Sequence, residues 1–268
     1  NGATRWIDLG FTTVQPSEFL KIGFVLALAW WLTPRARQLS DLRKGLIPFI
    51  VICALPTALL LAQPNTSTAL LILAVGATMY FAAGAPWRDF GILALCIITA
   101  FSAVASVRPY VLERVQTFLN PSANALSSGY QIQQSLIAIG SGGLLGRGFG
   151  QSVEKFNYLP EPSGDSVFAV FAEETGFVGA IFLLVLFVAL AARGIAIAGN
   201  SRDLFGGLLA LGFSSLIILQ AFINICAMLG MIPLTGLPLP FVSHGGTALA
   251  ATLLMCGFIL NVAAHRKA

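Results

Sequence analysis

The chain has 268 residues and a formal net charge of +4, and 57% of its residues are hydrophobic while only 10% are charged. A soluble globular domain carries about 25% charged residues, and the mean hydropathy of +0.85 is far too high for a soluble fold. The composition therefore excludes a soluble protein, and no basic cluster is long enough, or sufficiently interleaved with aromatic residues, to indicate nucleic-acid binding.

Continuous apolar stretches dominate the chain. In lipid every backbone polar group must be bonded internally, so only helices or a closed barrel can span a membrane. The stretches are much longer than the roughly ten alternating residues of a barrel strand, so they predict helices. Seven stretches approach the ~20 residues that a bilayer core requires, and they are 17–33, 46–62, 68–85, 90–107, 166–192, 205–230 and 245–263. We expect an all-α fold, a polytopic transmembrane helix bundle forming a single membrane domain over residues 1–268, with one long extracytoplasmic loop at about 108–165.

Lys and Arg near the ends of these stretches predict the orientation in the membrane. Nine of them fall on one side of the predicted membrane, namely Arg35, Arg37, Arg43, Lys44, Arg88, Arg193, Arg202, Arg266 and Lys267. Those on the other side lie mostly in the long 108–165 loop, which the rule weighs less. We therefore expect the C-terminus in the cytoplasm and the 108–165 loop outside. Because the first residue is Asn, we also expect the chain to begin partway through a longer protein, with an odd number of helices upstream.

Two ionisable residues lie at the start of the first apolar stretch, where charge is costly. Glu18 and Lys21 are three residues apart, so they share a helix face and are expected to pair. Two interpretations stay open: a structural ion pair at the helix mouth, with Ser17 as the helix N-cap, or part of a polar cavity. Further on, the polar break 63–68, which includes Asn65, is expected to form a turn that caps the following helix.

The 108–165 segment carries the acids Glu113, Glu154, Glu161 and Asp165. Asp165 directly precedes the apolar run that begins at Ser166. A carboxylate there can stabilise a helix N-terminus, or it can be a general base at the membrane surface, where a lipid-linked substrate presents its head group; position alone leaves both open. Glu173 and Glu174 lie further into the run, and adjacent side chains point about 100° apart on a helix, so we do not expect an acid–base pair.

Two segments between the apolar stretches are irregular. The glycine-rich run 140–150 lacks both the dinucleotide-binding fingerprint and a P-loop Lys-Ser/Thr, so we expect a tightly turned loop whose backbone amides could approach an anion. Prolines disfavour a regular helix over 233–247, where Ser243 and His244 are candidate substrate contacts; a lone His is more often structural.

The four cysteines lie inside apolar runs without metal-ligand spacing. They are Cys53, Cys96, Cys226 and Cys256.

Five groups of residues follow one another over nearly the whole chain. They are Arg5-Trp6-Ile7 with Gln15-Pro16-Ser17-Glu18 and Lys21; Gln63-Pro64-Asn65 with Thr68-Ala69; Asn120-Pro121 with Gly129-Tyr130-Gln131 and Ala138-Ile139-Gly140-Ser141-Gly142-Gly143; Tyr158-Leu159-Pro160-Glu161 with Asp165; and Thr235-Gly236-Leu237-Pro238-Leu239-Pro240-Phe241 with Gly245-Gly246. In this order they resemble the SEDS family of bacterial cell-wall polymerases (FtsW, RodA and SpoVE). Ser152, Lys155 and Tyr158 are more similar to the FtsW-type and sporulation members than to the elongation members. The family has ten helices, of which this chain would carry the last seven.

The resemblance implies a peptidoglycan glycosyltransferase that polymerises lipid II at the outer face of the bacterial cytoplasmic membrane, releasing undecaprenyl pyrophosphate. It implies Asp165 as the general base, and Lys155 with Arg108 or Arg114 as cations that offset the pyrophosphate charge. The expected substrate-binding residues are Arg5, Glu18, Lys21, Asn65, Arg108, Arg114, Lys155, Glu161, Ser243 and His244. A divalent cation, Mg or Mn, would suit this chemistry, although the sequence has no dedicated cage for one.

Four residues depart from the family pattern: Asn65 replaces an aspartate, Ser67 a glycine, Ser166 a phenylalanine and His244 a tyrosine. None removes Asp165, so we expect an active enzyme. The alternatives are a lipid II flippase, which has no need of a loop carboxylate, and a catalytically weak division scaffold.

The resemblance also implies a protein partner, a class B penicillin-binding protein with transpeptidase activity, together with other division proteins. Uncross-linked glycan does not make a wall, so the cross-linking activity must come from another chain. Small residues let membrane helices approach closely. Gly206 and Ala210 share a helix face and are one candidate contact surface, although they could equally pack within the chain.

Overall fold

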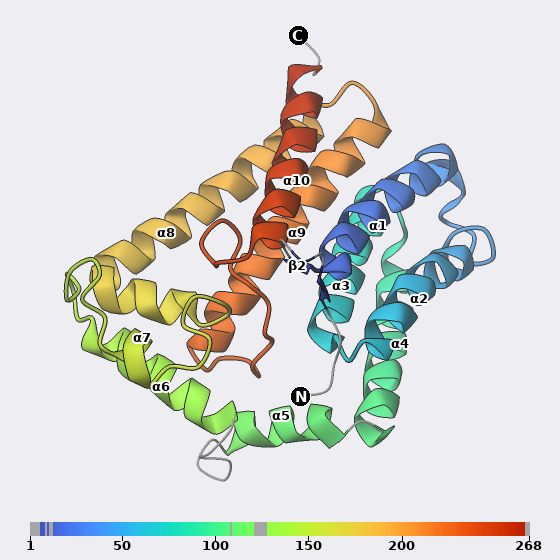
Figure 1. The fold of residues 1–268 in the computed structure, drawn as a ribbon. Coiled ribbons are helices and arrows are strands. Elements are labelled where there is room, and N and C mark those ends of the chain that lie inside the picture. Colours follow the sequence, from blue (N-terminus) through green and yellow to red (C-terminus); the bar gives the residue numbers. More distant parts are fainter. Residues whose placement is uncertain (1–5, 9, 11–12, 108, 121–127, 266–268) are drawn as a thin grey trace. The chain divides into compact units, whose positions relative to one another are not determined.

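The computed structural model describes residues 6–8, 10, 13–107, 109–120 and 128–265, and most of them are helical (Figure 1). The helices are α1 (Pro16–Leu32), the 3-10 helix η1 (Thr33–Gln38), α2 (Leu46–Ala62), α3 (Thr66–Ala82), α4 (Trp87–Val107), α5 (Pro109–Leu119), α6 (Ser128–Ser141), α7 (Glu154–Asn157), α8 (Val167–Gly199), α9 (Leu204–Met228) and α10 (Gly246–Ala264). The strands β1 (Ile7–Asp8) and β2 (Thr13–Val14) pair antiparallel, with Ile7 opposite Val14.

Each of the seven apolar stretches contains a helix, namely α1, α2, α3, α4, α8, α9 and α10. Among the described residues, four segments are long and apolar enough to cross a membrane: α1 with η1, α8, α9 and α10. The helices α2 and α3 are shorter but apolar. The all-α, multi-pass fold is thereby confirmed, while the count of seven spans and the single-domain organisation stay predictions.

The starts of α1 and α3 follow from local sequence. Pro16 occupies the first turn of α1, where its missing N–H costs nothing and its fixed φ suits the helix. Gln15 holds the cap position without a side-chain hydrogen bond, so the expected N-cap at Ser17 is wrong. Asn65 caps α3, because its side-chain oxygen accepts a hydrogen bond of 3.3 Å from the Thr68 amide.

The chain divides into two compact units. The first comprises residues 1–91, 189–219 and 245–268, and in it α1 packs on α2, α3 and α10. A Cβ atom at Gly212 of α9 would lie 2.7 Å from both Val25 Cγ1 and Met79 Sδ, so glycine permits close contact with α1 and α3. Ala210 is fully buried, and a Cβ at Gly206 would meet Ser201 Oγ at 2.8 Å. The Gly206–Ala210 face therefore packs within the chain, and its assignment as a partner surface is wrong.

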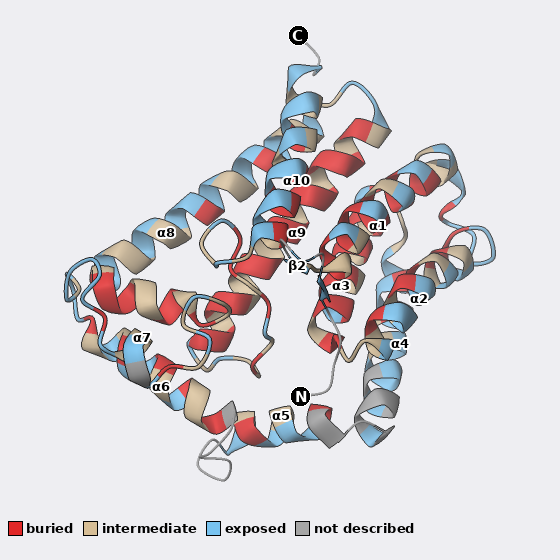
Figure 2. Cartoon of the chain, in the orientation of Figure 1, coloured by how far each residue is buried: buried red, intermediate tan, exposed pale blue. Residues whose placement is uncertain are grey.

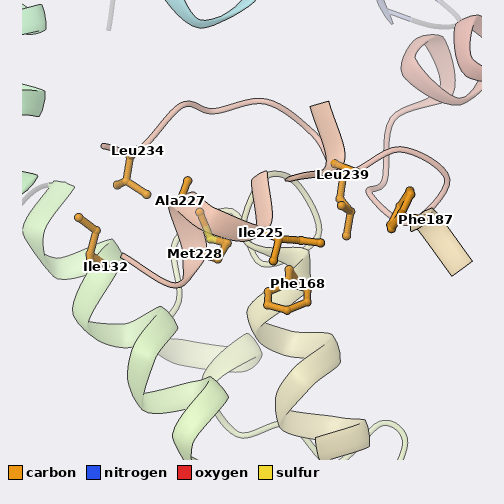
Figure 3. Packing of buried hydrophobic residues seen from close by; sticks show 9 residues of the cluster. Ile132, Phe168, Phe187, Ile225, Ala227, Met228, Leu234 and Leu239 are labelled. Atoms are coloured by element: carbon orange, nitrogen blue, oxygen red, sulfur yellow. The ribbon is translucent and has the colours of Figure 1, made fainter. Parts of the chain in front are cut away.

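The second unit comprises residues 92–188 and 220–244. Within it, the segment expected to be a loop contains the short helices α5, α6 and α7. A buried apolar cluster joins α6, α8, the end of α9 and the segment after it (Figure 3). The cluster consists of Ile132, Phe168, Phe187, Ala221, Ile225, Ala227, Met228, Leu234 and Leu239. Beyond this core, α8 carries many exposed positions (Figure 2), as expected of a helix that meets lipid.

The helix α8 is interrupted at Gly176, where φ is 69° and ψ is −169°. The glycine-rich run docks against this break by backbone hydrogen bonds: the amides of Arg147 and Gly148 donate to the carbonyls of Glu173 and Glu174 at 3.0 and 3.1 Å. These two amides are thus occupied by the chain itself rather than facing an anion. A Cβ at Gly146 would lie 2.1 Å from the Glu174 carbonyl oxygen, so only glycine allows this approach.

Candidate functional site

Asp165 lies in a tight turn immediately before α8, in the second unit. The carbonyl of Glu161 accepts hydrogen bonds from the amides of Gly164 and Ser166, at 3.0 and 3.3 Å. Glu161 itself has a φ of 48°, an uncommon value for a residue with a side chain. The turn therefore fixes the position of Asp165 at the helix start.

Side chains form hydrogen bonds that connect residues 224–243, at the end of α9 and after it, to this turn. Asn224 Nδ2 donates to the carbonyls of Asp165 and Leu237, both at 2.7 Å. Ser243 Oγ donates to the Gly164 carbonyl at 2.6 Å and accepts from the Leu239 amide at 2.7 Å. Two buried or half-buried neutral side chains thus join sequence regions that are 59 and 79 residues apart.

His244 continues the same connection through its backbone, since its amide donates to the Ser163 carbonyl at 2.7 Å. The His244 side chain is exposed. The predicted substrate contacts Ser243 and His244 are therefore brought to the Asp165 turn, and their substrate-binding role stays a prediction.

The Asp165 carboxylate is partly shielded from solvent and meets few donors. Gln131 Nε2 of α6 lies 3.4 Å from Asp165 Oδ1. Burial raises the pKa of Asp165 above its ordinary value of 3.8, and the nearby Glu161 carboxylate acts in the same direction. The amide of Gln131, the backbone amide of Asp165 and the charge of Arg114 on α5 oppose that rise in pKa. A carboxyl group with a raised pKa is a suitable proton acceptor near neutral pH.

A second cluster of charged groups surrounds the break in α8. Lys155 Nζ lies 2.6 Å from Glu174 Oε1 and also donates to the Gly150 carbonyl at 3.0 Å. Glu173 is fully buried, and its carboxylate accepts from Ser152 Oγ at 2.6 Å and from the Val153 amide at 3.1 Å. The structure thus gives Lys155, a predicted pyrophosphate contact, a carboxylate partner within the chain.

The remaining predicted residues belong to the first unit or fall outside the described residues. Lys21 Nζ is 2.7 Å from Glu18 Oε2 in the first unit, and both side chains are almost fully buried, which confirms the expected pair. Asn65, in the same unit, is the buried cap of α3. Arg5 and Arg108 lie outside the described residues.

Three side chains that shape the Asp165 turn were not singled out from the sequence as site residues: Gln131, Ser166 and Asn224. All are neutral, so no charge marked them, and their contacts are distant in sequence. Among the residues that the structure describes, no group of three or more His, Cys, Asp or Glu side chains could hold a metal ion.

Comparison with known proteins places this chain in a family. Residues 1–268 match the family profile described as Cell cycle protein, which covers FtsW, RodA and SpoVE. The chain belongs to this family. It is 40% identical to stage V sporulation protein E of Bacillus subtilis over 267 residues, covering 100% of this chain and 73% of that protein. It is 41% identical to the probable peptidoglycan glycosyltransferase FtsW of Coxiella burnetii over 266 residues, covering 98% of this chain and 72% of that protein.

The fold is also that of a solved relative. A chain from a structure described as the structural coordination of polymerization and crosslinking by a peptidoglycan synthase complex matches with a TM-score of 0.79 and 34% identity. The match covers 98% of this chain and 74% of that chain. The resemblance found in the motifs is therefore confirmed.

Proposed function

We propose that this chain is the catalytic part of a peptidoglycan glycosyltransferase that polymerises lipid II into glycan strands, with Asp165 as general base. The observation that carries the assignment of the base is the setting of Asp165. Asn224 of α9 donates to its backbone carbonyl, Gln131 of α6 lies near its carboxylate, and burial raises the pKa of that carboxylate. The names of the relatives support the same reaction class.

In the proposed step, the Asp165 carboxylate accepts the proton of an acceptor sugar hydroxyl. The hydroxyl oxygen forms a bond to the anomeric carbon of the donor, and the bond from that carbon to the pyrophosphate oxygen breaks. The electron pair of that bond leaves with undecaprenyl pyrophosphate. Arg114 lies close enough to influence Asp165 electrostatically, and we assign it to the developing negative charge.

An apolar cavity of about 220 Å³ lies between α6, α8 and the end of α9, in the second unit. Phe168 lines it three residues after Asp165, together with Ile139, Ala172 and Ile225. Such a lining suits part of the isoprenoid chain of the substrate, since burial of apolar surface is favourable. The assignment of Glu18, Lys21, Asn65, Lys155, Glu161, Ser243 and His244 to substrate binding belongs to the same proposal.

The location and partner complete the proposal. The distribution of Lys and Arg supports a cytoplasmic C-terminus and an Asp165 turn at the outer face of the bacterial cytoplasmic membrane. The likeness to a chain of a peptidoglycan synthase complex supports a class B penicillin-binding protein as partner.

Substitution of Asp165 by Asn tests the assignment, because it keeps the shape of the side chain while removing the base. Loss of a general base costs roughly 10²- to 10⁴-fold in rate. We expect Asp165→Asn in the full-length protein to insert and fold normally but to make no glycan chains from lipid II. Polymerisation at a near-normal rate would remove Asp165 from the mechanism, and lipid II transport without polymerisation by the wild-type protein would favour a flippase.

A further inference from the structure

The turn that holds Asp165 contains a hydrogen-bonded chain of neutral groups. Gln131 Nε2 donates to Ser166 Oγ at 2.9 Å, and Ser166 Oγ donates to the Pro160 carbonyl at 2.8 Å. The same Gln131 amide nitrogen lies 3.4 Å from Asp165 Oδ1. Ser166 is fully buried, so its hydroxyl cannot turn to water for other partners.

The directions of these bonds follow from the groups themselves. A backbone carbonyl can only accept, so the Ser166 hydroxyl proton is committed to Pro160 and the Ser166 oxygen is left to accept. An ionised carboxylate can also only accept. Gln131 therefore has to present its amide nitrogen, not its oxygen, to both Ser166 and Asp165.

We propose that Gln131 and Ser166 are positioning residues for the reaction, with the Ser166 hydroxyl orienting the Gln131 amide so that it donates to the ionised Asp165 carboxylate. This inference rests on the proposed role of Asp165 as general base. Ser166 stands where the family pattern has a phenylalanine, and its hydroxyl anchors the Gln131 amide here. At 3.4 Å the contact to Asp165 is long, as catalytic hydrogen bonds often are before substrate binds.

Removing the amide has a predictable effect on the pH dependence of the rate. A hydrogen bond to the charged form favours that form, so Gln131 lowers the pKa of Asp165 against the rise that burial causes. The charged groups facing Asp165 are Glu161 in its own turn and Arg114 on α5. Other titratable side chains on the elements around the turn include Tyr130 on α6, Glu113 on α5, Glu173 and Glu174 on α8, Cys226 on α9, and His244. All of these stay unchanged when Gln131 is substituted, so a shift in the acidic limb reports on Asp165.

The test is the rate of lipid II polymerisation against pH for the full-length protein with its partner. We expect Gln131→Leu to lower kcat on the order of 10-fold, less than loss of the base itself, to leave KM nearly unchanged and to move the acidic limb to higher pH. Gln133→Ala is the matched control, because Gln133 is an exposed glutamine on the same helix. We expect this variant to keep the wild-type profile.

Variants at Ser166 provide an independent test. Ser166→Ala should move the acidic limb of the pH–rate profile to higher pH, by a smaller amount than Gln131→Leu does. Ser166→Thr, which keeps a hydroxyl, should return the limb to the wild-type pH. If Gln131→Leu does not fold, these two variants decide the matter alone. A limb that stays at the wild-type pH in every folded variant would overturn the inference while leaving Asp165 as the base. Activity of Asp165→Asn would instead overturn the proposed function.

Discussion

Glu18 and Lys21 are 2% and 0% exposed, so neither charge can be solvated if the other is removed. Leaving a buried charge without its partner costs about 3–5 kcal/mol. We therefore expect Glu18→Ala and Lys21→Ala each to lower the thermal stability and the activity of the protein, and the double variant to cost less than the sum of the two. Thermal unfolding in detergent, combined with polymerisation assays, measures this cycle. Strict additivity would show that the ion pair makes no joint contribution.

Asn224 is the clearest single connection between α9 and the Asp165 turn. Its amide serves two carbonyls, so Asn224→Ala leaves the Asp165 and Leu237 oxygens without that donor. A buried polar group without its hydrogen bond costs about 1–3 kcal/mol. We expect reduced thermal stability and slower polymerisation. Asn200→Ala, at an exposed position, is the matched control and should behave as wild type; equal behaviour of the two variants would refute the role of Asn224.

At this scale, sequence predicted the local contacts and missed the distant ones. The Glu18–Lys21 pair follows from helical spacing alone, since only three residues separate its members. Gln131 and Asn224 reach Asp165 across 34 and 59 residues. No periodicity links residues so far apart, and their neutral side chains gave no charge signal.

At the scale of elements, the glycine-rich run and the break in α8 form one unit of structure. A Cβ at Gly176 would lie 2.3 Å from the Gly146 amide nitrogen, so Gly146→Ala and Gly176→Ala should both disrupt the docking. Both residues also have positive φ, which adds strain of order 1–3 kcal/mol for a residue with a side chain. We expect lower thermal stability and faster backbone hydrogen exchange over residues 142–150.

Gly140→Ala provides the control for this prediction. Gly140 lies in α6, and a Cβ there would meet no other atom within 4 Å. Alanine favours a helix over glycine by about 1 kcal/mol, so this variant should be neutral or slightly stabilising. Similar losses in all three variants would mean that the run tolerates no substitution for reasons unrelated to docking.

The long apolar helices could be predicted from sequence because their composition alone requires them in lipid. The helices α5, α6 and α7 were not predicted from the sequence, because they are short and their segment is polar and rich in glycine and proline. The break at Gly176 was equally hidden, since a single glycine inside an apolar run is usually tolerated in a helix. The backbone dihedral angles of Gly176 and its contacts with residues 142–148 reveal it.

At the scale of the whole molecule, the proposed partner is a class B penicillin-binding protein. We expect such a protein to co-purify in detergent with the full-length enzyme and to raise its activity in reconstituted membranes. Since Gly206 packs within the chain against Ser201 and Asp203, we expect Gly206→Leu to lower the thermal stability of the chain rather than to block the partner specifically. Failure of every class B penicillin-binding protein of the same cell to co-purify or to stimulate would refute the partnership.

The central claim is that this chain makes glycan strands, and the most direct measurement is their length. Purified full-length protein, reconstituted with its partner and supplied with lipid II, should convert it into long chains that a gel resolves. The Asp165→Ala variant, at the same concentration and equally well folded, should leave lipid II unextended. Absence of chains with the wild-type complex, or chains of equal length with Asp165→Ala, would contradict the account.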